Sequence, residues 1–281
     1  MANDMLNVAI WGAAGNMGTR ACNRLREEPG YRVICVEPMA AGVEKLRARG
    51  DTPVAPEAAA GTADIVVLAI ADKFIRGVAA DLVPMMKSGA MMLMLDPAAA
   101  YADILPARAD VSYFVTHPTH PPVFNDETDP EARRDYFGAG RAKQSIVNAL
   151  VQGPEADYAK GEAVARAYFR PIINSHRVTL EQMAILEPAM SETCSATFVV
   201  AMKEAMEEAI ARGVPRQAAY DFLMGHINVQ LAIVFEQIDW RMSEGAYHVI
   251  REAQKRIFRP DWKGVFDREE LKASVKGIVN A

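Results

Sequence analysis

A glycine-rich turn near the N-terminus constrains the fold of this chain more than any other feature. The apolar run Asn7–Trp11 is typical of a β-strand, and residues 19–28 have the amphipathic pattern of a helix. Glycines between them allow a tight turn, which brings backbone N–H groups against a pyrophosphate at the start of the helix. The spacing is Gly-x-x-Gly-x-x-Gly, a variant of the Gly-x-Gly-x-x-Gly pattern. The alternative is a purely structural turn, but the strand–turn–helix context predicts a dinucleotide site formed by Gly12, Ala13, Ala14, Gly15, Asn16, Met17 and Gly18.

Short apolar runs continue to alternate with helical patterns after this turn. The runs at 31–36, 64–70, 90–95 and 111–115 are nearly unbroken, as expected for a parallel sheet covered on both faces. Two more strand candidates, at 145–151 and 171–177, flank a helical pattern at 156–168, whereas residues 121–143 carry the turn signals of a loop. The rhythm predicts an α/β fold with a Rossmann doubly wound parallel sheet.

The pattern changes at Thr179. Thr179 and Gln182 form a Thr-x-x-Gln capping box that opens a helix, and the sequence stays helical to about residue 257. We therefore expect an NAD-binding Rossmann domain over 1–178 and an all-α C-terminal domain over 179–281, serving substrate binding and dimerisation. The helix expected over 216–237 is apolar on more than one face, which predicts burial by a second subunit and hence a homodimer.

Charge and cysteine content exclude several classes of protein. The chain has 281 residues and a net charge of −5, without the basic stripe of a nucleic-acid binder. Its longest apolar runs are far shorter than the roughly 20 residues of a membrane-spanning helix. Three cysteines form no disulfide framework, and no cleavable leader is apparent. We expect a soluble protein of the cytoplasm that contacts neither membrane nor nucleic acid.

Acidic residues at two strand ends bear on the choice of dinucleotide. Glu37 ends the second strand, where a carboxylate accepts hydrogen bonds from ribose hydroxyls and repels a 2′-phosphate. This predicts NAD rather than NADP, although a surface acid is the alternative. Ala71 and Asp72 end the next strand, where we expect the nicotinamide half of the cofactor.

Two histidines follow the strand at 111–115. His117 and His120 lie in a proline-punctuated turn, at the sheet edge where open parallel sheets bind ligands. Such imidazoles serve as proton acceptors or as metal ligands. The alternative is a pair of hydrogen-bonded loop histidines.

Glu187 stands in an otherwise apolar helical segment beside Pro188. Burial of a carboxylate costs several kcal/mol unless the group is paired or bound to a metal. We therefore predict that His117 and Glu187 hold a divalent metal, either zinc, manganese or magnesium. The alternative is a glutamate on the helix surface.

The glycine turn, Glu37, residues 65–72 and the helical second half resemble the 6-phosphogluconate dehydrogenase and β-hydroxyacid dehydrogenase superfamily. His117-Pro118 and the helix containing Glu187 are most similar to the D-apionate oxidoisomerase group. The resemblance implies an NAD-dependent oxidoreductase acting on a CH–OH group of a branched sugar acid, with rearrangement of D-apionate to 3-oxo-isoapionate. For this reaction we predict a catalytic set of His117, Glu187 and His120, with His120 or water completing the ligand shell of the metal.

One feature departs from the better-known members of that superfamily. They carry a catalytic lysine on the first helix of the second domain, but this chain has no lysine between Lys160 and Lys203. His117 would then act either as the base that accepts the hydroxyl proton or as a metal ligand, one role at a time. A prephenate dehydrogenase-like enzyme or another β-hydroxyacid dehydrogenase is the alternative activity, and a non-catalytic NAD-binding sensor is the alternative of another class.

Overall fold

The structure, a computed structural model, describes residues 5–280 and divides into two compact units. The first runs through Glu187 and resumes at Lys272, and the second is Pro188–Leu271. The sequence patterns put the division at residue 178 instead. The difference arises because buried Met183, on helix α7 (Leu180–Ala184), joins the core of the sheet, and because Val275 of helix α11 (Arg268–Asn280) packs near Ala98.

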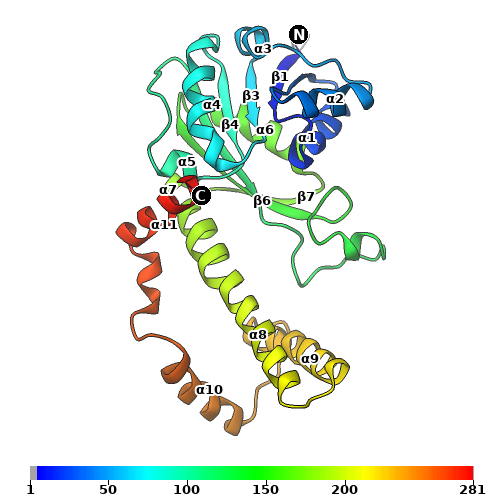
Figure 1. Cartoon of the computed structure of the whole chain (residues 1–281), viewed down its shortest axis with the longest axis vertical. Helices are drawn as coiled ribbons and strands as arrows, with labels where there is room; N and C mark the ends of the chain where they lie inside the picture. Colours follow the sequence, from blue (N-terminus) through cyan, green and yellow to red (C-terminus); the bar gives the residue numbers. More distant parts are fainter. Residues whose placement is uncertain (1–4, 281) are drawn as a thin grey trace. The chain divides into compact units, whose positions relative to one another are not determined.

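A seven-stranded sheet forms the centre of the first unit (Figure 1). Its order is β2-β1-β3-β4-β5-β6-β7, and all pairings are parallel except that of β5 with β6. The strands are β1 (Leu6–Trp11), β2 (Tyr31–Val36), β3 (Ile65–Leu68), β4 (Met91–Met94), β5 (Ser112–Pro118), β6 (Gln144–Gln152) and β7 (Ile172–Arg177).

The predicted Rossmann sheet is confirmed, but its last two strands run against the others. The connection between β5 and β6 contains only the short 3₁₀ turn η1 (Ala132–Arg134). A parallel return usually runs through a helix, and residues 119–143 form no helix beyond η1. Helix α6 (Asp157–Phe169) supplies such a crossover between β6 and β7, which are parallel.

Helices cover both faces of the sheet, so its strands are buried on both sides. In β3, Ile65 and Val67 pack into one apolar cluster, and Val66 and Leu68 pack into the other. The first cluster includes α1 (Asn16–Arg26), α2 (Ala40–Ala48) and α6, and the second includes α3 (Pro56–Thr62), α4 (Asp72–Met85) and α5 (Ala98–Tyr101).

The second half is helical, as predicted. The capping box at Thr179 is confirmed, because its side chain accepts a hydrogen bond from the Gln182 N–H at 3.1 Å. A π-helical segment, η2 (Ile185–Ala196), follows, and Pro188 inside it removes one backbone donor from the regular α-helical ladder. The remaining elements are α8 (Thr197–Ala211), α9 (Arg216–Val234), α10 (Glu244–Ile257) and η3 (Trp262–Phe266). Over residues 5–280, no helix combines the length and apolarity needed to cross a membrane.

Candidate functional site

The glycine turn lies between β1 and α1, and packs more closely than side chains would allow. Gly12 has φ +76°, and a Cβ atom on it would lie 2.5 Å from the Ala69 carbonyl oxygen. A Cβ atom on Gly18 would lie 2.1 Å from the Gly12 carbonyl oxygen. Gly15 is the N-cap of α1, so no side chain caps this helix N-terminus. The turn thus has the close backbone approach and the open helix end that suit a pyrophosphate.

Glu37 follows β2 and lies beside this turn. One carboxylate oxygen accepts a hydrogen bond from the Ala14 N–H at 3.3 Å, and the other accepts one from the Met39 N–H at 3.3 Å. Gly42 leaves room for the side chain, because a Cβ atom there would lie 2.4 Å from the Glu37 Cγ. The carboxylate is therefore fixed at the position from which ribose hydroxyls can be bound.

A cavity of about 480 Å³ opens at the carboxyl ends of the parallel strands. Its wall includes predicted site residues from two regions: Asn16, Met17, Ala71 and Asp72 at the starts of α1 and α4, and His117, His120 and Glu187 on or near β5. Asp96 and Phe137 also line it.

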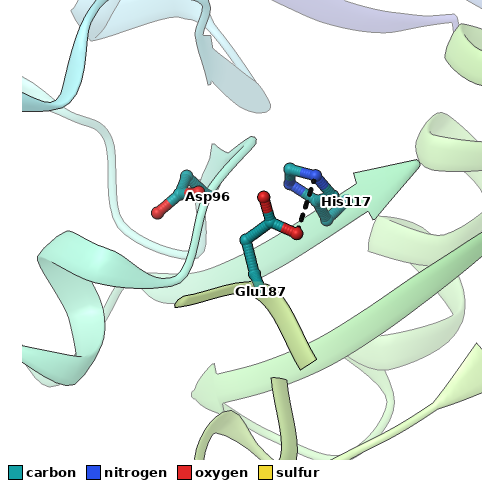
Figure 2. A group of neighbouring side chains, drawn as sticks. All are labelled: Asp96, His117 and Glu187. Carbon is teal, nitrogen blue, oxygen red and sulfur yellow. Dashed lines mark ion pairs between the residues drawn. The ribbon is translucent and has the colours of Figure 1, made fainter. Parts of the chain in front are cut away.

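Three of these side chains point toward one another (Figure 2). Asp96 follows β4, His117 lies on β5 and Glu187 lies on η2. One ligand atom from each lies within 4.8 Å of the other two, and Nε2 of His117 is 3.4 Å from Oε2 of Glu187. Asp96 was not among the site residues predicted from the sequence. The signal was available, because Asp96 directly follows an apolar strand at the same sheet edge as His117.

The hydrogen bond on the far side of the His117 ring decides what its Nε2 atom can do. Nδ1 lies 2.8 Å from the Leu95 carbonyl oxygen, which can only accept, so we infer that Nδ1 carries the proton. Nε2 of the neutral ring then presents a lone pair to the carboxylate of Glu187. When Glu187 is ionised, two acceptors face each other in this arrangement, and a cation between them would satisfy both.

The electrostatics of the cluster also favour a cation. Burial, with a smaller contribution from the Asp96 carboxylate, raises the pKa of Glu187 to about 7. Burial likewise raises the pKa of Asp96, against a hydrogen bond that its carboxylate accepts from the Ala98 N–H. Two half-buried carboxylates this close together repel each other when both are ionised, and a divalent ion would offset that repulsion.

His120 lies near this group but is not part of it. Its ring centroid is 6.3 Å from that of His117, and its backbone has φ +59°, which is uncommon for a residue other than glycine. Its Nδ1 lies 3.0 Å from the Phe137 carbonyl oxygen, so by the same reasoning Nδ1 donates and Nε2 can accept a proton.

Asp135 organises the loop that carries Phe137. Its carboxylate accepts hydrogen bonds from the backbone N–H groups of four residues, at 2.7–3.2 Å: Ala139, Gly140, Arg141 and Ala142. Burial alone would raise the pKa of Asp135, but these four donors hold it below its ordinary value.

We expect Asp135→Asn to destabilise the protein by about 1–2 kcal/mol at pH 7, because charged acceptors bind N–H groups more strongly than neutral ones. The folded pKa is lowered, so this stability is present above the unfolded value of 3.8 and is lost as the pH falls through the folded pKa. Denaturant unfolding at pH 7 and pH 3 should therefore show a difference that shrinks in acid. Asp126→Asn, at an exposed position of the same loop, is the control. An equal difference at both pH values would contradict this account.

Comparison with known proteins identifies the relatives of this chain. Residues 125–279 match the phosphogluconate dehydrogenase (decarboxylating) C-terminal family. D-apionate oxidoisomerase of Cupriavidus necator is 47% identical over 96% of this chain and 98% of its own length. The enzyme of the same name from Rhizobium rhizogenes is 46% identical over 98% of this chain and 100% of its own length.

A solved structure resembles the whole fold. It is described as a semialdehyde dehydrogenase NAD-binding protein from Cupriavidus necator in complex with calcium and NAD. The TM-score is 0.94 with 47% identity, and the match covers 97% of this chain and 99% of that one. The chain therefore belongs to the D-apionate oxidoisomerase family, and its C-terminal half to the phosphogluconate dehydrogenase C-terminal family.

Proposed function

We propose that this chain is an NAD-dependent oxidoisomerase that oxidises a CH–OH group of D-apionate and rearranges the product to 3-oxo-isoapionate. The observation that carries the proposal is the cluster of Asp96, His117 and Glu187 in the same cavity wall as the glycine turn. Relatives of 46% and 47% identity over nearly the whole chain are named D-apionate oxidoisomerase, which supports the substrate and the class of reaction.

The residues around the turn fit NAD. Gly12 and Gly18 let the backbone come close to a pyrophosphate, and the uncapped start of α1 favours its negative charge. Glu37 suits two ribose hydroxyls and disfavours a 2′-phosphate. Ala71 and Asp72 would contact the nicotinamide half. Bound NAD would accept the hydride that leaves the carbinol carbon.

The cluster fits a divalent metal, a proposal that extends the predicted His117–Glu187 pair to Asp96. Two atoms that each lie about 2.1 Å from one ion are separated by roughly 3.0–3.5 Å at ligand angles of about 90–110°. The 3.4 Å between the His117 and Glu187 atoms agrees with this. The bond from the His117 ring to the Leu95 carbonyl is the outer-shell contact typical of metal-bound histidines. A divalent ion would polarise two substrate oxygens as a Lewis acid and hold them together for the carbon shift.

His120 is left free to move a proton. With His117 assigned to the metal, His120 is the remaining predicted catalytic residue in the cavity wall, and its unprotonated Nε2 can accept the hydroxyl proton as hydride leaves. The bond to the Phe137 carbonyl keeps this ring in the accepting tautomer.

A substrate screen tests the function. The purified protein with a divalent metal should reduce NAD when D-apionate is added, and should not do so with prephenate or 6-phosphogluconate. NAD binding without reduction by any of these acids would favour the sensor alternative. Reduction with prephenate alone would overturn the proposal.

We also propose that the chain is a cytoplasmic homodimer that pairs through its second unit. Among α8, α9 and α10, the described residues include only Ala219 as a buried one. Phe222 on α9 is 68% exposed, and Trp240, between α9 and α10, is 74% exposed. A unit that buries so few of its apolar side chains needs a partner to cover the exposed ones. A second copy of the same chain is the partner that is always available. The cysteines Cys22, Cys35 and Cys194 are all free, as suits a reducing compartment.

Light scattering should give twice the chain mass of 30.7 kDa at micromolar concentration. Phe222→Asp should lower that mass or the cooperativity of unfolding, since it places a charge in the proposed interface. The control is Gln217→Glu, which places a charge at an exposed polar position of the same helix. A wild-type chain that stays monomeric up to these concentrations would contradict the dimer.

A further inference from the structure

Phe137 contributes an aromatic ring to the wall of the cavity that holds the carboxylates and histidines. It is the one phenylalanine among the described residues lining this cavity, and it is 55% exposed. Its neighbour Tyr136 is 80% exposed and is not among the described lining residues. Two adjacent exposed rings on one loop therefore differ in whether they reach the cavity.

The backbone around Phe137 is fixed by hydrogen bonds from several elements. The carbonyl of Gly138 accepts one from the Gln144 side chain at 3.1 Å, and that of Gly140 accepts one from Arg24 at 2.6 Å. The Phe137 carbonyl oxygen accepts a hydrogen bond from Nδ1 of His120, and the Asp135 carboxylate accepts hydrogen bonds from the backbone N–H groups that follow Phe137. Because the backbone of this loop is already ordered, it loses little conformational freedom when a ligand contacts the ring. More of the contact energy therefore remains for binding.

The surroundings of the ring indicate which ligand it contacts. Phe137 packs against His120 with ring centroids 4.9 Å apart, and His120 lies 6.3 Å from His117. Phe137 thus adjoins the histidine side of the cavity. There Asp96, His117 and Glu187 offer polar atoms for the oxygens of a sugar acid, but its carbon skeleton needs an apolar surface that excludes water.

We propose that Phe137 is a specificity-determining residue that contacts the carbon skeleton of the branched sugar acid and limits the size of acid that the cavity accepts. Asp135 is the positioning residue that holds it there. The inference rests on the proposed function and adds the residue that selects the substrate.

Steady-state kinetics of matched variants test it. Phe137→Ala should lower kcat/KM for D-apionate by roughly 10- to 100-fold, mainly through KM, because apolar contact and water exclusion are lost. It should also reduce about tenfold the preference for D-apionate over the larger D-gluconate. Phe137→Leu, which remains apolar, should lie between wild type and Phe137→Ala. Tyr136→Ala is the control and should stay within about twofold of wild type.

The Kd for NAD, measured by titration, separates the outcomes. It should be the same in Phe137→Ala and wild type. Equal kinetics for Phe137→Ala and Tyr136→Ala would overturn the inference, as would a loss of NAD affinity as large as the loss for D-apionate. Failure of the proposed function would show already in the wild type, which would then not reduce NAD with D-apionate, and this would overturn both.

Discussion

Replacement of Glu187 by Gln is expected to lower kcat/KM for D-apionate by roughly 100-fold or more, with the Kd for NAD unchanged. The substitution keeps the size of the side chain but removes the charge that, together with Asp96 and His117, would hold the metal. Lewis-acid stabilisation contributes several kcal/mol to a transition state, and each 1.4 kcal/mol is about tenfold in rate. Asp96→Asn should have the same effect, which the predicted His117–Glu187 pair alone does not require.

Chelation provides a second route to the same loss. Wild-type enzyme dialysed against a chelator should lose activity and regain it when Mg²⁺, Mn²⁺, Zn²⁺ or Ca²⁺ is restored, whereas Glu187→Gln should not recover. Glu181→Gln, at an exposed glutamate on the preceding helix α7, is the control and should behave as wild type. Full activity of the chelated wild type would exclude the metal, and full activity of Glu187→Gln would exclude a role for this carboxylate.

Replacement of Gly18 by Ala is expected to weaken NAD binding on the order of 100-fold. The added Cβ would lie 2.1 Å from the Gly12 carbonyl oxygen and 2.7 Å from the Ala13 Cα. Both atoms belong to the backbone, so the clash can be relieved only if α1 moves away from the turn. Gly30→Ala is the matched control, since nothing lies within 4 Å of its Cβ position. It should retain the affinity for NAD.

Calorimetric titration of NAD measures both variants. Circular dichroism during thermal unfolding shows whether Gly18→Ala retains its fold, with a lower Tm as the expected cost of the moved helix. A folded Gly18→Ala protein with wild-type affinity would contradict the assignment of this turn to the dinucleotide.

Local sequence features were sufficient for the elements of the fold. Short apolar runs predicted most of the strands, because a strand that is covered by helices on both faces is largely apolar. The Thr179 capping box predicted a helix start, because its two hydrogen bonds form between residues three apart. The antiparallel direction of β6 could not be predicted in this way. It depends on how residues 119–143 return to the sheet and not on the residue pattern of β6 itself.

The residues of the candidate site also fall into two groups, those that the sequence predicts and those that only the structure brings together. The glycine turn, Glu37 and the two histidines could be predicted from the sequence, because each lies at or just after the end of an apolar strand, at the sheet edge where ligands bind. The folded structure was needed to show that Asp96 joins His117 and Glu187, that His120 stands apart from them, and that Phe137 reaches the cavity. These residues come from segments far apart in the chain. Their distances follow from strand order and helix packing, which no local pattern of residues encodes.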